Sequence, residues 1–342
     1  VQIVQHDMQF AISVLDYRHT ETAELQSLVE QLMRQEGEKP FDLQHDFMIR
    51  ANFIKLPAQN GQPFGVLLFS LHHIAADGWS MEIVTKEFVE EYFALLQGRP
   101  CAVVAPEIQY GDFALWQQSH LDEQTLSNQL DFWQRQLEAV PTVHNLSLDY
   151  PRPDFKSYRG TRISRPLSAE FCTQVLAFAK VHGLTPFMLL HAVFTLVFSR
   201  CSNQTEFVVG TPAANRMKSE LRNVIGFFVN TLVLKANVKA KNINAFLDHI
   251  KTVNLDAQAN QDVPFEQIVE RCVTSRSSQY TPLFQVLLSA GSGDAPSLAL
   301  PGIQLAPIAG KSVVAKFDID VNATINDAGG QLNWVFDSSI FK

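Results

Sequence analysis

Two adjacent histidines, His72 and His73, are the side chains of this sequence best suited to catalysis. A carboxylate, a glycine and a hydroxyl follow closely, at Asp77, Gly78 and Ser80. Imidazole titrates near neutral pH, so a histidine in a cleft can accept a proton from an incoming nucleophile. Histidines and a carboxylate are also common metal ligands. From the residues alone, three interpretations stay open: a structural turn, a metal site and a general base.

The segments around the histidines predict the elements that must position them. Apolar residues alternate over 47–56, an Asn-Gly pair follows within 57–61, and 64–71 is an apolar run. Together they predict a β-hairpin that leads into the histidines. Ser80 is then expected to cap a helix that has one apolar face and ends at Gly98. We therefore expect the two histidines on a turn between a strand and a helix.

Helical and strand patterns alternate through the rest of the chain and predict an α/β fold. Prolines and a glycine interrupt the polar stretch 149–160, which is typical of a connection between lobes. At 342 residues the chain is long enough for two domains, which we predict as 1–150 and 151–342. The predicted helices cover 126–137, 169–182, 186–198 and 245–257, and the predicted strands cover 206–210, 227–235, 283–289, 317–325 and 331–336, the last two turning at Gly329 and Gly330.

Composition and charge narrow the classes of function. A net charge of −8 gives no basic footprint for nucleic acid. The four cysteines form no CxxC pair, which indicates neither a zinc knuckle nor a disulfide framework and favours the reducing cytoplasm. The apolar run 187–198 is about half of the ~20 residues that a membrane span needs and contains His191, so it predicts a buried helix. No signal peptide is visible in 1–9.

The segment 72–80 reads HHIAADGWS and resembles the HHxxxDG signature of nonribosomal peptide synthetase condensation domains, which are relatives of chloramphenicol acetyltransferase. The residues of this segment and of the segment IGFFVNTL are most similar to those of the elongation subtype, which joins an L-configured donor to an L-configured acceptor. The segments that resemble further signatures, in the family's order, are 110–116 (YGDFALW), 225–232 (IGFFVNTL), 260–266 (NQDVPFE), and Arg276 with 282–286 (PLFQV).

This resemblance implies a V-shaped pseudodimer of two chloramphenicol-acetyltransferase-like lobes, with His73 in the tunnel between them. An upstream carrier domain would present an aminoacyl or peptidyl thioester on its phosphopantetheine arm. The α-amine of an aminoacyl group on a downstream carrier would attack that thioester. His73 is expected either to take the proton of the amine or to hold the amine in line. The expected partners are the carrier domains and an adjacent adenylation domain. No bound cofactor or metal is expected, and the domain is expected to be monomeric and cytoplasmic.

The resemblance also assigns roles around His73. His72, Asp77 and Gly78 complete the expected catalytic set. Asp77 is further expected to form a structural salt bridge with Arg216, which would fix the loop rather than do chemistry. The side chains expected to line the substrate tunnel are Trp79, Ser80, Asn230 and Thr231.

The residues themselves offer alternatives to several of these roles. Gly78 permits either an awkward turn or close approach of a substrate. Backbone N–H groups near Ser80 are candidates for stabilising an oxyanion. Asn230 and Thr231 end an apolar strand, where they would instead satisfy backbone groups. The residues with the spacing of a helix core are Tyr110, Phe113 and Trp116, and those placed to cap a helix at Pro264 are Gln261, Asp262 and Glu266.

The sequence departs from the family pattern at both ends. Two early signatures, of the SxAQxR and RHExLRT types, and the C-terminal helix have no counterpart, so we expect either a fragment of a longer synthetase or a trimmed domain. Competing functions are a related acyltransferase that forms esters or epimerises, a carrier-docking module without catalysis, and a metal hydrolase. Trp79 counts against an epimerising enzyme, because that subtype tends to carry a different residue after the glycine.

Overall fold

The computed structural model describes residues 3, 9–274, 277–293, 303, 306, 308, 310 and 313–342, so Arg276 of the last signature lies outside the described residues. The chain forms two compact units, and each is described by itself. The described residues of the first unit fall within Val1–Ala102, Ile225–Phe227 and Ala299–Ser312. Those of the second unit fall within Val103–Val224, Phe228–Leu298 and Val313–Lys342.

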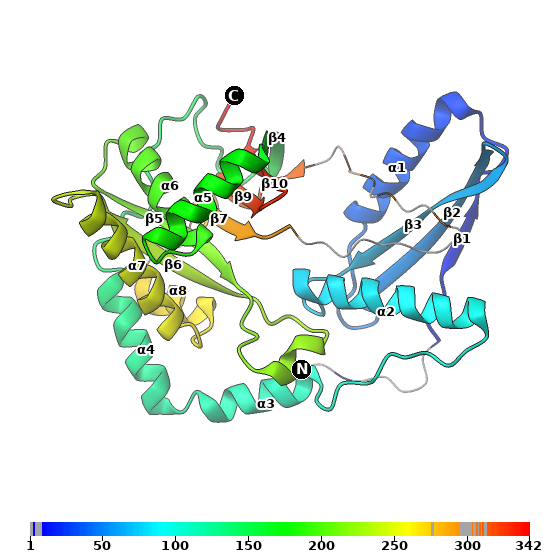
Figure 1. Ribbon diagram of the computed structural model, residues 1–342, viewed down its shortest axis with the longest axis horizontal. Helices are drawn as coiled ribbons and strands as arrows, with labels where there is room; N and C mark the ends of the chain where they lie inside the picture. Colours follow the sequence, from blue (N-terminus) through cyan, green and yellow to red (C-terminus); the bar gives the residue numbers. More distant parts are fainter. Residues whose placement is uncertain are drawn as a thin grey trace. The chain divides into compact units, whose positions relative to one another are not determined.

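The first unit is built on a three-stranded sheet of order β1-β2-β3 (Figure 1). Strand β1 (Ser13–Asp16) pairs with β2 (Ile49–Gln59) in parallel, and β2 pairs with β3 (Gln62–Leu71) in an antiparallel hairpin. A short 3-10 turn (Thr22–Glu24) leads into α1 (Leu25–Glu38), which packs on one face of the sheet. The buried apolar residues of that contact are Leu25, Val29, Ile54, Leu56 and Val66.

The hairpin and the helix predicted around the histidines are both present. Asn60 and Gly61 have φ values of 51° and 75°, the left-handed conformation that a tight two-residue turn requires. Helix α2 covers Gly78–Gln97 and stops at Gly98, whose φ is 61°. The predicted cap was wrong, because the N-cap is Asp77, whose side chain accepts a hydrogen bond from Ser80 N. Ser80 instead lies in the first turn of the helix.

Within the described residues, the second unit contains a mixed seven-stranded sheet of order β6-β5-β7-β9-β10-β4-β8. Helices α5, α6 and α7 pack against its strands (Figure 1). The strands are β4 (Arg159–Leu167), β5 (Glu206–Ala213), β6 (Asn230–Asn237), β7 (Val286–Gly291), β8 (Val313–Val314), β9 (Ile319–Asn326) and β10 (Gly329–Asp337). The helices are α3 (Tyr110–His120), α4 (Glu123–Gln136), α5 (Ala169–Val181), α6 (Pro186–Ser202), α7 (Ile243–Ala259) and α8 (Phe265–Cys272), with a 3-10 turn η2 (Ser219–Asn223).

The division into units differs from the predicted ranges 1–150 and 151–342, because residues 103–150 pack with the second unit. Trp133 of α4 is fully buried in the largest core cluster, together with Phe198 of α6 and Phe207 of β5. Its indole N–H donates to the backbone oxygen of Asn260 at 2.8 Å. The segment Ile225–Phe227 belongs to the first unit although its chain neighbours belong to the second.

Strand β4 occupies part of the stretch that we predicted to be an irregular connection. Its side chains are mostly exposed, so it lacks the alternation of apolar and polar residues that marks a half-buried strand. The final hairpin is present as β9 and β10, but it turns at Asp327 and Ala328, and Gly329 already pairs with Asn326.

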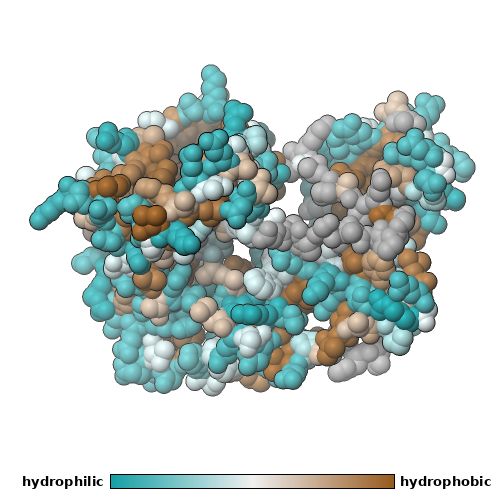
Figure 2. Space-filling view, viewed as in Figure 1, coloured by the Kyte–Doolittle hydropathy of each residue, from teal (hydrophilic) through white to brown (hydrophobic). Residues whose placement is uncertain are grey.

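Apolar side chains also reach the surface of the second unit. Figure 2 shows brown residues over the region of α5 and α6; the exposed ones on these helices are Phe171, Phe178, Val181, Val193, Leu196 and Val197. Among the described residues no single helix is long and apolar enough to cross a membrane, and only α5 with α6, bent by 97°, meet the length and composition criteria as a pair.

Candidate active site

His73 lies on the loop between β3 and α2, and its ring is held from two sides. Its Nδ1 lies 2.8 Å from the backbone oxygen of Ala76. Because a carbonyl oxygen only accepts hydrogen bonds, Nδ1 carries the proton, and Nε2 of the neutral ring keeps a lone pair. The ring also packs edge to face against Phe227, with centroids 4.8 Å apart and planes at 70°. The exposed side chain is thus held as the tautomer that a general base needs.

His72 is half-buried and is engaged by its own surroundings. Its Nδ1 accepts a hydrogen bond from the backbone N–H of Ile74 at 3.1 Å. Its ring packs edge to face against Phe41, which also contacts the Arg50 guanidinium, 3.8 Å from the ring centroid. These contacts fit a residue that shapes the loop, and its place in the catalytic set stays a prediction.

Asp77 and Ser80 join the histidine loop to a distant segment of the chain. Asp77 Oδ1 accepts from Ser80 N and lies 2.8 Å from Ser80 Oγ. Ser80 Oγ accepts from Gly226 N at 3.0 Å and lies 2.9 Å from Gly226 O, which also accepts from Asp77 N at 3.2 Å. Both side chains are buried, Ser80 completely. The carboxylate therefore shapes the loop, Ser80 is buried within it, and the tunnel role expected for Ser80 stays a prediction.

Two expectations for the start of α2 change with these contacts. Gly78 has no positive φ, so the awkward turn that we considered for it is wrong. A Cβ at Gly78 would meet no atom within 4 Å, and close approach of a substrate there stays a prediction. The N–H of Ser80 is already bonded to an anionic carboxylate, which removes it as an oxyanion donor. Trp79 is 43% exposed, and its role in a tunnel is untested.

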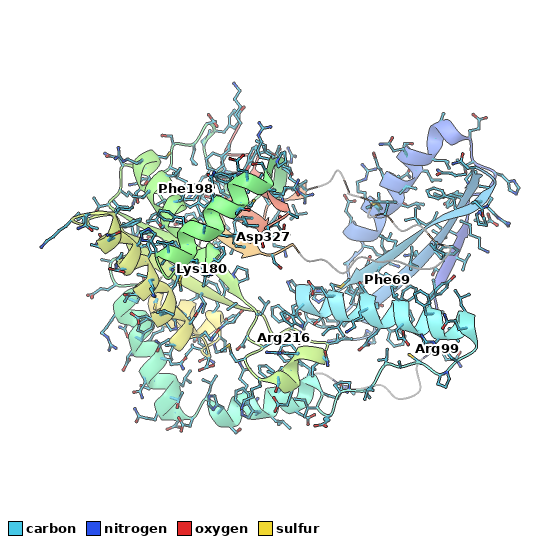
Figure 3. All side chains as sticks on the ribbon, in the orientation of Figure 1. Phe69, Arg99, Lys180, Phe198, Arg216 and Asp327 are labelled. Carbon is cyan, nitrogen blue, oxygen red and sulfur yellow. The ribbon has the colours of Figure 1, made fainter. Side chains whose placement is uncertain are left out.

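Arg216 organises a loop of the second unit (Figure 3). Its Nη1 donates to the backbone oxygens of Leu221 and Val224, each at 2.6 Å, and its guanidinium carbon lies 4.0 Å from the ring centroid of Phe228. The side chain is buried. The predicted salt bridge would join it to Asp77 of the first unit, and that pair stays a prediction.

The side chain of Asn230 is fully used by the backbone. Its Nδ2 donates to the oxygens of Gln261 and Val263 at 2.7 and 2.8 Å. Its Oδ1 accepts from Thr231 N at 2.8 Å and from Phe265 N at 3.1 Å. An amide has two donor hydrogens and two acceptor lone pairs, so none is left for a substrate. Asn230 therefore takes the backbone-satisfying role, and the tunnel role of Thr231 stays a prediction.

The NQDVPFE segment contacts α4 and leads into α8. Asp262 accepts from the side chain of Gln129 at 2.9 Å, and the Gln129 oxygen accepts from Val263 N at 3.3 Å. Pro264 is the N-cap of α8, and Glu266 lies in its first turn. The segment therefore contacts α4 and begins α8 at Pro264, but α8 has no side-chain cap hydrogen bond, so the predicted capping by Gln261, Asp262 and Glu266 is wrong.

The predicted aromatic core of α3 is partly confirmed. Phe113 is 5% exposed, and its ring lies 4.7 Å from that of Phe228, which Tyr110 also contacts edge to face. Trp116 packs against the same cluster but also stacks on His120 at 4.7 Å. These residues form a core cluster of the second unit around Phe228 of the IGFFVNTL segment.

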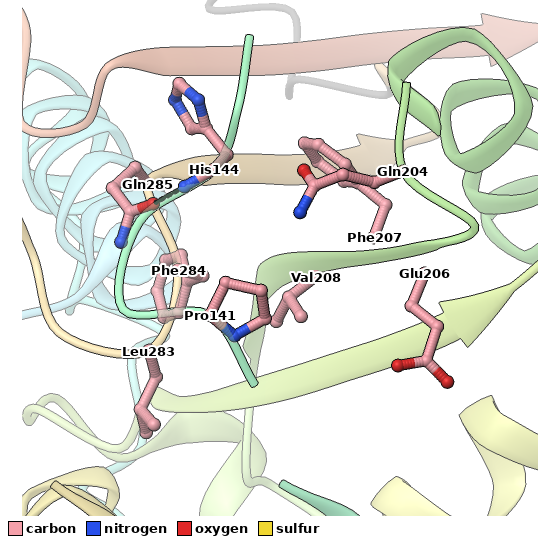
Figure 4. Close-up of a pocket in the computed structure, with 9 residues that line it drawn as sticks. All are labelled: Pro141, His144, Gln204, Glu206, Phe207, Val208, Leu283, Phe284 and Gln285. Carbon is pink, nitrogen blue, oxygen red and sulfur yellow. Dashed lines mark hydrogen bonds between the residues drawn. The ribbon is translucent and has the colours of Figure 1, made fainter. Parts of the chain in front are cut away.

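A small pocket in the second unit (Figure 4) is too small to be a substrate site. Its volume of 20 Å³ is suited to one water molecule and excludes a substrate. His144, which lines it, donates its backbone N–H to Gln285 at 3.0 Å and pairs through Nε2 with Asp318 at 2.9 Å. Arg152 contacts the same carboxylate. In the part of the chain that the structure describes, no group of three or more His, Cys, Asp or Glu side chains could hold a metal ion.

Phe227 is the neighbour of His73 that sequence reasoning missed. The segment was assigned to a strand, whereas β6 begins only at Asn230. The only available signal was the place of Phe227 within the IGFFVNTL segment.

The sequence model of the condensation domain matches residues 1–342, so the chain belongs to the condensation domain family. A linear gramicidin synthase from Brevibacillus parabrevis is 35% identical over 94% of this chain. Malpinin synthetase from Mortierella alpina is 34% identical over 97% of it. The chain spans only 6% and 4% of these two synthetases.

Solved structures share the fold over nearly the whole chain. The X-domain from teicoplanin biosynthesis has a TM-score of 0.85 at 21% identity and covers 100% of this chain, which covers 76% of it. The same kind of domain in complex with OxyB scores 0.81 at 22% identity, with coverages of 98% and 72%. The four-domain nonribosomal peptide synthetase AB3403, bound to AMP and glycine, scores 0.79 at 25% identity, with coverages of 98% and 26%. The predicted α/β class is confirmed.

Proposed function

We propose that this domain forms an amide bond between two carrier-bound substrates, in the elongation reaction that joins an L-configured donor to an L-configured acceptor. The observation that carries the proposal is the hydrogen bond from His73 Nδ1 to the oxygen of Ala76, at 2.8 Å. It leaves Nε2 of the neutral ring as a proton acceptor. Membership in the condensation domain family supports the class of reaction.

In the proposed reaction the α-amine of the acceptor attacks the thioester carbonyl of the donor. A C–N bond forms and the C–S bond breaks. The proton that leaves the nitrogen passes to Nε2 of His73 and then to the departing thiolate, so the ring ends neutral. An α-amine has a pKa of about 8, and only its unprotonated form attacks. Alternatively, Nε2 would hold the amine in line by accepting a hydrogen bond from its N–H. This second role also depends on His73.

The proposed partners follow from the reaction. Both substrates would be carried on phosphopantetheine arms, one on an upstream and one on a downstream carrier domain, beside an adenylation domain. The similarity to one part of a four-domain synthetase and to small parts of much longer synthetases supports this setting. We propose that the domain binds no cofactor of its own and works in the cytoplasm.

The proposal is tested by looking for the product in the synthetase module that contains this domain. The donor carrier is loaded with an L-aminoacyl thioester and the acceptor carrier with an L-amino acid. Intact-protein mass spectrometry is then expected to find a dipeptidyl thioester on the acceptor carrier. A hydroxy acid on the acceptor carrier tests the ester-forming alternative. Product from the hydroxy acid alone, or from neither acceptor, would refute amide formation.

A second candidate is a protein-binding module without catalysis. The X-domain structure in complex with OxyB favours it, because this fold there holds another protein. It predicts that the domain binds a loaded carrier in a pull-down while no dipeptidyl thioester forms.

A further inference from the structure

The segment Ile225–Phe227 is attached to the histidine loop rather than to the sheet that follows it. It belongs to the first unit, while Phe228 begins a stretch of the second. The backbone N–H and C=O of Gly226 both contact Ser80 Oγ, at 3.0 and 2.9 Å, and Ser80 is completely buried. Asp77 N donates to the same carbonyl. The position of the next residue, Phe227, is therefore set by the loop that carries His73.

Phe227 makes the aromatic contact with the His73 ring. The ring centroids are 4.8 Å apart and the planes are inclined by 70°, a preferred edge-to-face arrangement. The hydrogen bond to Ala76 fixes Nδ1 but leaves the ring free to tilt about it. A second contact on the ring removes that freedom. The two contacts together define where Nε2 lies.

We propose that Phe227 is a positioning residue for His73, held in place by the contact between Ser80 and Gly226. This inference rests on the proposed function, because the value of a fixed Nε2 lies in proton transfer or in alignment of the amine. An aromatic side chain is required, since an aliphatic one of similar volume offers no polarised ring edge or face to the imidazole. Phe227 does not itself touch the reacting atoms in this account.

The segment provides a matched control. Ile225 lies two residues earlier and is 39% exposed, compared with 37% for Phe227. Replacing either by alanine removes a similarly accessible apolar side chain, but Ile225 has no ring, so only Phe227 of the two can make an aromatic contact with His73. General loosening of the segment would therefore affect both variants, whereas loss of the ring contact affects one.

The test compares Phe227→Leu, Phe227→Tyr, Phe227→Ala and Ile225→Ala in the synthetase module. With both carriers saturating, Phe227→Leu and Phe227→Ala are expected to lower the single-turnover rate constant by about threefold to tenfold, the worth of one aromatic pair. Phe227→Tyr should restore the rate and Ile225→Ala should keep it. Half-saturating carrier concentrations should not change. A wild-type rate in Phe227→Leu, or an equal loss in Ile225→Ala, would overturn the proposal.

A second readout does not depend on catalysis. In protein labelled with ¹⁵N-histidine, the ring nitrogens of His73 are expected to show one neutral tautomer, protonated at Nδ1. Phe227→Leu should give a mixture of tautomers or broadened signals, and Phe227→Tyr should not. Unchanged His73 signals in Phe227→Leu would overturn the positioning role even if the rate fell. A full rate in His73→Ala, with the ring signals shifted in Phe227→Leu, would instead refute the proposed function.

Discussion

His191 predicts a loss of stability in mild acid that can be calculated from its surroundings. It lies in α6 and is fully buried. Burial, with a smaller repulsion from His249, lowers the pKa of His191 from 6.5 to about 3. Its Nδ1 lies 2.9 Å from the side-chain amide nitrogen of Asn254, which also donates to the oxygen of Ile250. Nδ1 therefore accepts a hydrogen bond, and a proton there would face another donor.

The lowered pKa of His191 determines how stability changes with pH. The unfolded chain binds a proton at His191 below about pH 6.5, whereas the folded chain does so only near pH 3. The stability is therefore complete above 6.5 and is lost as the pH falls from there toward 3. Each pH unit corresponds to about 1.36 kcal/mol. At pH 5 the neutral, buried His191 therefore lowers the free energy of unfolding by about 2 kcal/mol relative to its value above pH 6.5.

The assay is urea unfolding of the wild type and His191→Gln at pH 7.5 and 5.0, followed by tryptophan fluorescence. Trp133 is fully buried in the second unit and reports its unfolding. The wild type is expected to lose about 2 kcal/mol more than His191→Gln between the two pH values. His45→Gln, at an exposed histidine of the first unit, is the control and should follow the wild type. Equal losses of stability in acid for wild type and His191→Gln would show that protonation of His191 does not destabilise the fold.

Three further predictions concern packing and charge in the second unit. Asp318→Asn should lower the free energy of unfolding by about 3 kcal/mol in urea titrations, because Arg152 would be left partly buried beside a neutral group. Burial raises the pKa of Asp318, but hydrogen bonds from His144 and Arg152 outweigh burial and hold this pKa below its usual value. The stability that Asp318 provides is therefore present above about pH 4 and is lost as the pH falls below that. Asn230→Ala should lower the free energy of unfolding by about 2 to 3 kcal/mol through unsatisfied backbone groups and should raise amide hydrogen exchange in α8. Unchanged exchange in α8 would show that the Asn230 hydrogen bonds do not hold the start of this helix. Gly210→Ala places a Cβ 2.1 Å from the Phe284 ring and should lower the free energy of unfolding, followed in thermal melts, by about 1 to 3 kcal/mol. Gly111→Ala meets open space and should be neutral or stabilising in the same melts.

The sequence predicted the local structure around His73 well, because short-range signals determine it. The Asn-Gly turn, the apolar strand before the histidines and Gly98 each act within a few residues. The N-cap was misassigned because Asp77 and Ser80 are both good cap residues, and only the backbone path decides between them. The awkward turn was one of two interpretations of Gly78, and it could not be decided from the sequence because a glycine in sequence does not reveal its φ.

Long-range contacts were the part that the sequence could not provide. The grouping of 103–150 with the second unit depends on Trp133 packing with Phe198 and Phe207, residues far away in the chain. The contact of Phe227 with His73 depends on Ser80 holding Gly226, 146 residues later. Strand β4 was missed because its exposed side chains show no period of two. The periodicity of apolar residues shows which face of an element is buried, but it does not show which distant part of the chain covers that face.

We propose that His73 drives amide formation, and the single-turnover rate constant of the module is the measurement that decides this. Wild type, His73→Ala and His45→Ala are compared in the same synthetase module, with both carriers loaded and saturating. The rate constant for dipeptidyl thioester formation is expected to fall by roughly 100-fold or more in His73→Ala and to be unchanged in His45→Ala. A His73→Ala rate within a few-fold of the wild type would contradict it.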